Sequence, residues 1–365
     1  MNNTSTIPPH HLFFILVGTL IGPGFFRLPS ALIKIAKQDA WISAILGLIY
    51  PFTITLLCVY IINNAETKGI ASISKMYLGN LIGSITCFFF IIQYIFFFIS
   101  MMGDFIIMFS TYVVGFLTPV KILIVAFIVS IYTISKDIET LAKVNEISVY
   151  LLAFLIALSL FSFKYLDILN IQPILGSGLK NIIKASKQTF YFYLGPEILL
   201  YFYPFVSPSK GIKKWSLLAV SFSSVVWILC CLITVLYLGV EVSQKSNWPF
   251  IYVYESVNIK VINNFMYILI FVWAFVVYKS LSNNLFASIN VLSNITKVNK
   301  KIILIILIPF SFAFSLVLSK NKFRTLTLGT VSNIFIIFNI LYVLILVFLI
   351  YLNKKNKYIY KKAKS

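Results

Sequence analysis

Long apolar stretches make up most of this chain, and short polar segments that carry many of the lysines separate them. The stretch Phe88–Phe98 is apolar at nearly every position, and Ile302–Phe310 is apolar throughout. A helix on the surface of a soluble protein has one polar face, and the strands of a membrane barrel alternate between polar and apolar residues. Neither pattern is present in these stretches. The sequence therefore predicts helices that lie in a lipid bilayer, and it excludes a β-barrel.

About 20 apolar residues cross a bilayer as a helix, so the chain predicts about ten membrane-spanning helices. We expect them at about residues 10–34, 40–62, 81–116, 122–134, 147–163, 187–206, 215–239, 261–292, 302–318 and 331–352. Between the fourth and the fifth, the mixed charges of residues 135–146 predict a separate surface helix. Residues 164–186 predict an interfacial loop with a short helix.

Two of the predicted crossings are interrupted near their middle. The first contains Gly22-Pro23-Gly24, and the sixth contains Gly195-Pro196-Glu197. Glycine and proline at these positions free backbone groups that an unbroken helix would pair, and such groups are tolerated in a bilayer only against protein, water or a ligand. An interrupted membrane helix is therefore a candidate binding site, as in many secondary transporters. The alternative is a plain kink packed against a neighbouring helix.

The two interruptions occupy matching places in the two halves of the chain. Each lies in the first crossing of its half, about ten residues from the start, which is the plan of an inverted repeat. We therefore expect an all-α polytopic membrane protein with a five-plus-five inverted repeat and broken helices 1 and 6. The single transmembrane domain, residues 1–365, would comprise one repeat at about 10–163, a second at about 187–352 and a basic tail at 353–365.

Composition and charge agree with a membrane protein. The chain is 60% hydrophobic and 11% charged, with a mean hydropathy of +0.96, which is too apolar for a soluble domain. Its net charge of +20 comes from lysines in loops and in the tail, so anionic lipid headgroups explain it better than nucleic acid does. The distribution of these lysines modestly favours cytoplasmic termini.

The residues at the interruptions suggest how a small polar ligand could bind. Gly22 and Gly24, on either side of Pro23, allow a close approach to the main chain, and the half-helix that begins near Phe25 would attract a carboxylate. Glu197, which follows Gly195 and Pro196, could pair with an ammonium group, cap its own helix, or do both.

Other polar residues near the breaks have two interpretations each. Arg27 could contact an anionic ligand group or extend to the membrane surface, and Tyr193 could contact the ligand or only pack. Asp104 could pair with a Lys or Arg, or carry a proton. For Lys279, extension of the side chain to the inner membrane interface is favoured over a role in ion coupling. Asn283 and Asn284 form a polar patch that could hold a coupling ion.

Catalytic and metal-binding patterns are not present in the sequence. The only histidines are the adjacent His10 and His11, and no motif of a metalloprotease or serine hydrolase is found. We therefore expect neither an enzyme nor a metal or other cofactor.

Three segments of the N-terminal region carry a family resemblance. They are Pro8–Ile15, Ile21–Pro29 and Ala36–Ser43, which together give Gly-x-Gly-x-x-x-Leu-Pro followed by Ala-Lys-x-Asp-x-Trp-Ile-Ser. This pattern resembles the spore germination B-subunit family, the GerAB-type permease-like receptors of the amino acid-polyamine-organocation superfamily. Weaker similarity continues at Asn170–Gly178, at Phe192–Glu197 and at Trp248-Pro249.

The resemblance implies a germinant-sensing subunit in the inner membrane of a spore. Such a subunit would have a LeuT-like transporter fold, bind a small nutrient such as an amino acid, and act with a membrane A subunit and a lipoprotein C subunit. The alternative is an amino-acid transporter, a secondary active permease of the same fold.

Overall fold

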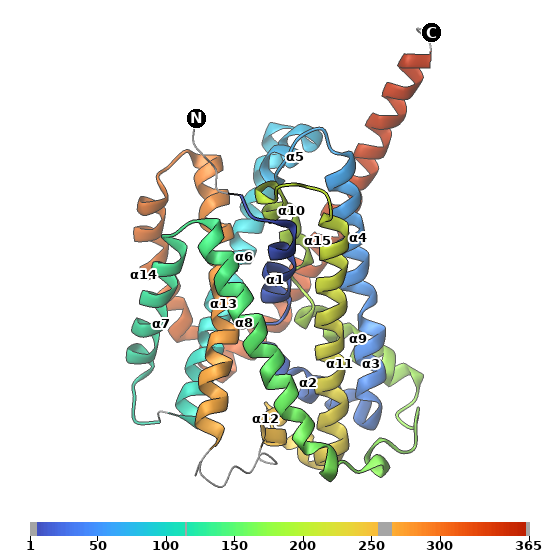
Figure 1. The fold of residues 1–365 in the computed structure, drawn as a ribbon, viewed down its shortest axis with the longest axis vertical. Coiled ribbons are helices and arrows are strands. Elements are labelled where there is room, and N and C mark those ends of the chain that lie inside the picture. Colours follow the sequence, from blue (N-terminus) through green and yellow to red (C-terminus); the bar gives the residue numbers. More distant parts are fainter. Residues whose placement is uncertain (1–5, 114, 255–264, 363–365) are drawn as a thin grey trace.

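The computed structural model describes residues 6–113, 115–254 and 265–362, and its regular elements are helices that form one elongated bundle (Figure 1). Outside the helices these residues contain an isolated bridge between Ile7 and Val206. The described α-helices are α1 (Pro9–Leu20), α2 (Leu28–Ala36), α3 (Ala40–Gly47), α4 (Ile49–Asn64), α5 (Ile70–Leu78), α6 (Asn80–Tyr112), α7 (Pro119–Ile134), α8 (Ile138–Ser159), α9 (Leu179–Phe192), α10 (Leu199–Phe202), α11 (Ile212–Lys245), α12 (Pro249–Val253), α13 (Phe265–Thr296), α14 (Lys300–Leu318) and α15 (Asn321–Lys362). Short 3-10 helices are η1 (Pro23–Phe26), η2 (Lys37–Asp39), η3 (Leu160–Tyr165), η4 (Ile168–Ile171), η5 (Pro196–Ile198) and η6 (Tyr203–Phe205).

Within the described residues, seven helical segments are long and apolar enough to cross a bilayer. They are Leu28–Asn64, Asn80–Tyr112, Ile138–Tyr165, Ile212–Lys245, Met266–Thr296, Lys300–Leu318 and Thr327–Lys355, and the apolar helices α1 and α7 are shorter. The protein is therefore a polytopic helical membrane protein, as the sequence predicts. The count of about ten crossings and the inverted repeat stay predictions.

The predicted surface helix at residues 135–146 is wrong. Its charged residues belong to the first turns of α8, which continues without a break into the fifth predicted crossing. Leu141 and Ala142 are fully buried on one face, whereas Glu139 and Lys143 pair at 2.9 Å on the exposed face. Asp137 caps the helix because its carboxylate accepts the backbone N–H of Thr140 at 3.0 Å. The mixed charge marks the solvated start of a crossing.

Other helices differ from the predicted ranges mainly at their ends. The sixth predicted crossing begins with α9 at residue 179, and the tenth begins with α15 at residue 321. The predicted start of the eighth, at residue 261, lies outside the described residues. Helix α15 continues through residue 362, so most of the predicted basic tail is helical.

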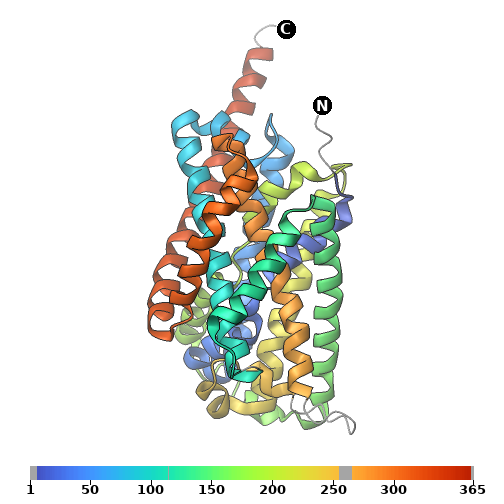
Figure 2. The same ribbon diagram turned by 90° about the vertical axis from the view of Figure 1, so that its left-hand side faces the viewer.

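The interrupted first segment lies at the centre of the bundle. Helix α1 packs against α8, α11 and α13, and α2 packs against α9 and α11. Figure 1 shows α7 and α14 at one edge of the bundle and α3 and α9 at the other, with α1 between them. The start of α1 and the end of α15 lie toward the same end of the molecule in both views (Figures 1 and 2). This arrangement agrees with an even number of crossings.

The residue pattern that carries the family resemblance also joins two distant segments. Asp39 is fully buried, and its carboxylate accepts the backbone N–H groups of Leu175 and Ser177, both at 2.8 Å. The Ser177 hydroxyl donates to the same carboxylate at 2.7 Å. Asp39 thus fixes the loop before α9 against the end of α2, which positions the two interrupted segments relative to each other.

Candidate functional site

The first interruption is present where the sequence predicts it. Helix α1 ends at Leu20, and Ile21 and Gly22 have extended backbone angles. The 3-10 turn η1 follows, and α2 begins at Leu28. The main chain between α1 and α2 therefore runs through the middle of the bundle without α-helical pairing.

The second interruption is also present, and it contacts the first. Between α9 and η5, Gly195 has a φ of 130°, a conformation that favours glycine. A Cβ atom on Gly195 would lie 3.0 Å from Thr19 Cγ2 in α1. The main chain at the second break therefore packs against Thr19, near the end of α1.

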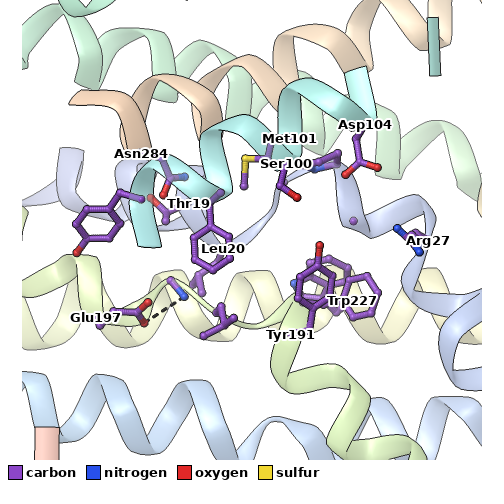
Figure 3. A pocket seen from close by; sticks show the side chains of 18 residues that line it. Thr19, Leu20, Arg27, Ser100, Met101, Asp104, Tyr191, Glu197, Trp227 and Asn284 are labelled. Carbon is purple, nitrogen blue, oxygen red and sulfur yellow. Dashed lines mark hydrogen bonds between the residues drawn. The ribbon is translucent and has the colours of Figure 1, made fainter. Parts of the chain in front are cut away.

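A small cavity lies between the two breaks (Figure 3). Its volume is about 60 Å³. Eight residues of its lining are candidates from the sequence: Gly22, Pro23, Gly24, Arg27, Asp104, Gly195, Glu197 and Asn284. Ten other residues complete the lining, and the sequence did not give them as ligand candidates, although Tyr191 beside the second break could contact a ligand or only pack; they include Thr19, Tyr94, Ser100, Met101, Tyr191 and Trp227. These six residues come from four helices, α1, α6, α9 and α11, and no local pattern in the sequence marks them.

The charged groups of the cavity are separated. Figure 3 shows Glu197 toward one end, and Arg27 and Asp104 toward the other. Glu197 is fully buried, and its carboxylate accepts Gln93 Nε2 at 2.5 Å and the backbone N–H of Gly195 at 3.2 Å. Glu197 thus caps its own break, which supports one of its two interpretations. Its carboxylate still lines the cavity and has no ion pair within the described residues.

Asp104 forms a buried ion pair, which was one of the two roles that the sequence left undecided for it. Arg324, at the start of α15, approaches its carboxylate to 2.6 Å. The guanidinium also donates to the carbonyl oxygens of Ser100 and Leu318, both at 3.3 Å. Of the alternatives for Asp104, the structure favours pairing with arginine.

Lys279 does not extend to the membrane surface, so that interpretation is wrong. Its side chain is fully buried, and Nζ donates to the carbonyl oxygens of Ile21 at 2.7 Å and Val276 at 3.0 Å. The adjacent Ser280 hydroxyl donates to the carbonyl oxygens of Gly18 and Ile21. The end of α1 leaves these carbonyls without helical partners, and α13 supplies the donors. Lys279 lies behind the cavity and does not line it.

The two asparagines of α13 have different surroundings. Asn283 Nδ2 donates to the Ile15 carbonyl at 3.1 Å and to Asn145 Oδ1 at 2.9 Å, so it links α1, α8 and α13. Asn284 donates to the Ser280 carbonyl at 2.8 Å and lines the cavity. A role of either residue in ion coupling stays a prediction.

Three further candidates lie outside the cavity lining. The Tyr193 hydroxyl donates to the Ala44 carbonyl at 3.1 Å, and its ring packs edge-on against Trp227. Phe25 is buried against Phe26 and Phe250. Pro196 is buried as the first residue of η5. These residues shape the breaks, and their contact with a ligand stays a prediction.

A larger cavity adjoins the small one. It measures about 930 Å³ and shares Arg27, Tyr191 and Phe192 with the small cavity. Its remaining lining includes α15 residues between Leu328 and Ile337. The three shared side chains therefore form the wall between a wide vestibule and the buried space at the breaks.

Two interrupted helices that meet at a small cavity with a few polar groups are typical of permease-like membrane proteins. The family described as spore germination protein matches residues 6–324. The chain belongs to this family.

The individual relatives are similar over most of their length. The chain is 22% identical over 326 residues to spore germination protein GerQB of Bacillus cereus, which covers 89% of this chain and 90% of that protein. It is 27% identical over 266 residues to spore germination protein A2 of Bacillus subtilis (strain 168), with 71% and 72% covered. To spore germination protein KB of the same organism it is 24% identical over 258 residues, with 68% and 67% covered.

Proposed function

We propose that this chain is the B-type subunit of a spore germination receptor and that it binds a small nutrient in the cavity between the two breaks. Membership of the spore germination family supports the first statement. The observation that carries the second is the contact of both interrupted segments around one buried cavity with separated charges.

The groups of the cavity suit an amino acid. The Glu197 carboxylate would pair with the ligand ammonium, and Arg27 with the main chain at Gly22 and Gly24 would receive the ligand carboxylate. The volume favours a small ligand over one with a bulky side chain. The vestibule beyond Arg27 would supply the ligand after movement of Tyr191 and Phe192.

Binding would signal by shifting the bundle between two conformations. A ligand can shift such an equilibrium only through its different affinities for the two states. The A subunit and the lipoprotein C subunit would respond to the favoured state in the inner membrane of the spore. We propose about ten crossings in an inverted five-plus-five repeat, with cytoplasmic termini. This arrangement agrees with the start of α1 and the end of α15 lying toward the same end of the molecule (Figure 1).

The alternative function is secondary transport of an amino acid. One observation favours it, because paired interrupted helices around a central site are also the architecture of secondary transporters. Uptake separates the two functions. Labelled alanine that accumulates in vesicles containing this chain alone would favour a transporter, and binding without accumulation would favour a receptor.

The test of the binding proposal is equilibrium binding to the purified chain in lipid nanodiscs. We expect saturable binding within a panel of small amino acids and at least tenfold weaker binding of the N-acetyl and decarboxylated forms of the same compound. Equal binding of all three forms would contradict the assignment of the two charged ends. Absence of binding across the panel would overturn the site.

A further inference from the structure

A group of buried polar side chains lies next to Glu197 and does not line the cavity. Gln93 of α6 and Asn339 of α15 are fully buried, and Tyr50 of α4 is 4% exposed. Gln93 contacts the Glu197 carboxylate directly, and Asn339 faces both that carboxylate and the Tyr50 hydroxyl. Helix α4 packs against both η5 and α15, which brings these side chains together.

Several polar atoms of this group have no hydrogen-bond partner within the described residues. They are the Tyr50 and Tyr94 hydroxyls, Gln93 Oε1, and both Oδ1 and Nδ2 of Asn339. An unsatisfied buried polar group costs about 1–3 kcal/mol, so several around one point indicate an occupant that the protein atoms do not supply. Apart from the hydrogen bond from Gln93 Nε2 to Glu197, these atoms do not pair with one another, as is expected of oxygens that share an ion at about 2.4 Å and therefore lie about 3.4 Å or more apart.

The charge of the surrounding side chains indicates the chemical class of the occupant. Glu197 is buried without an ion pair in the described part of the chain, and a buried carboxylate needs either a cation or a proton. The surrounding acceptors are carboxylate, carbonyl and hydroxyl oxygens, which are the ligands that hard cations prefer. A single carboxylate among neutral oxygens balances one positive charge. This composition favours a monovalent ion over a divalent one.

We propose that the chain binds one alkali cation, Na⁺ or K⁺, between Glu197, Gln93, Asn339 and Tyr50. Tyr94 follows Gln93 in α6, lines the nutrient cavity and has an unpaired hydroxyl within the described residues, so this oxygen is a candidate fifth ligand. Nζ of Lys279 donates to the Ile21 carbonyl at the first break, whereas the carboxylate at the second break would bind a free cation.

The cation and the nutrient would exclude each other, a statement that rests on the proposed function. Both would neutralise the same buried carboxylate, and one negative charge cannot compensate two positive charges in a medium of low dielectric constant. By linkage, a cation that lowers nutrient affinity is itself bound less tightly when the nutrient is present. The cation would thus stabilise the nutrient-free conformation.

The test is the thermal unfolding of the purified full chain in nanodiscs without nutrient. Tm is measured at constant ionic strength while NaCl or KCl replaces N-methylglucamine chloride. We expect a saturable rise of about 2–5 °C with at least one of the two alkali salts. Equal Tm values in all three salts at every ratio would overturn the proposal and would indicate that water or a proton satisfies the group.

Matched variants distinguish loss of the cation site from a general loss of stability. Asn339→Leu and the milder Tyr50→Phe should shift the midpoint of the cation titration at least tenfold, or abolish the rise. Asn290→Leu and Tyr254→Phe remove a buried amide and a buried hydroxyl outside this group and should keep the rise. If Asn339→Leu does not fold, Tyr50→Phe decides, and an unchanged titration in it overturns the assignment.

The competition is tested by nutrient binding at several cation concentrations. We expect the apparent Kd for alanine to rise at least fivefold between salt-free and saturating alkali conditions. A cation-dependent Tm without nutrient binding would retain the ion site and reject the proposed function. Nutrient binding that is independent of the cation, with a cation-dependent Tm, would reject the competition.

Discussion

The ammonium group of Lys279 lies 2.7 Å from the carbonyl oxygen of Ile21, the residue at which α1 has just ended. No carboxylate pairs with Lys279 in the described residues, so α13 is attached to the first break by a hydrogen bond from Nζ and not by a salt bridge. Any movement of the broken segment on binding has to lengthen or break this contact. Lys279 therefore fixes the position of the break without lining the cavity.

Replacing Lys279 with methionine should separate stability from function. Ser280 still donates to the Ile21 carbonyl at 3.2 Å, so that oxygen keeps a donor. Burial of a lysine without a carboxylate partner is unfavourable, so methionine, an apolar side chain of similar length, can replace it without loss of stability. We expect an unchanged or higher Tm together with a lost germination response, measured on the purified chain and on spores. The exposed Lys143→Met is the control for both readouts, and a fall of more than about 5 °C in Lys279→Met would show a structural role instead.

The sequence predicted the parts of the site that depend on local chemistry. Adjacent glycine and proline disfavour a continuous helix, so Gly22-Pro23-Gly24 and Gly195-Pro196-Glu197 predicted both breaks from the sequence alone. The apolar stretches predicted the polytopic helical class because hydrophobicity is likewise a local property of the sequence. The charged start of α8 was wrongly predicted to be a separate surface helix. Its partial burial on one face depends on packing against other helices, which the sequence alone does not show.

Partners that are distant in sequence could not be predicted. Arg324 lies before the predicted tenth crossing, so nothing marked it as the partner of Asp104. The lysine at 279 was assigned to the interface by counting residues along a helix, but a carbonyl freed by the distant break at Ile21 holds it in the interior. Such contacts depend on how the helices pack, and helix packing leaves no local signal.

A side chain at Gly24 should interfere with ligand binding. A Cβ atom there would lie 2.8 Å from the ring of Phe192, which lines the same cavity. We expect Gly24→Leu to abolish the response to germinant while protein levels stay normal, and Gly24→Ala to weaken nutrient binding. Adding Phe192→Leu to Gly24→Ala should restore part of the binding.

The matched control for Gly24 is Gly115→Leu. A Cβ atom at Gly115 would meet only ordinary van der Waals contact, so this variant should retain normal binding and response. Loss of the Gly24→Leu protein itself, measured by immunoblot of spore membranes, would indicate a packing role for Gly24. Full response in the variant would contradict the location of the site.

Glu197→Gln should weaken the binding of ligands that have a free ammonium group. The substitution keeps the shape of the side chain but removes the charge that strengthens the hydrogen bond. Charged hydrogen bonds contribute about 1.5–3 kcal/mol, so we expect roughly 10- to 150-fold weaker binding of alanine. N-acetylalanine, which lacks the ammonium, should bind both proteins alike. An unchanged alanine Kd would restrict Glu197 to capping its own break, and Glu139→Gln on the exposed face of α8 is the control.

The buried pair of Asp104 and Arg324 should show strong coupling in a double-mutant cycle. Removing one partner leaves the other charge buried without compensation, at a cost of about 3–5 kcal/mol, whereas removing both leaves no uncompensated charge. We expect Arg324→Met and Asp104→Leu each to lower the Tm more than the double variant does. The measurement is thermal unfolding of all four proteins under the same conditions. Additive losses would mean that Arg324 stabilises the fold through the Ser100 and Leu318 carbonyls, and that its pairing with Asp104 contributes nothing.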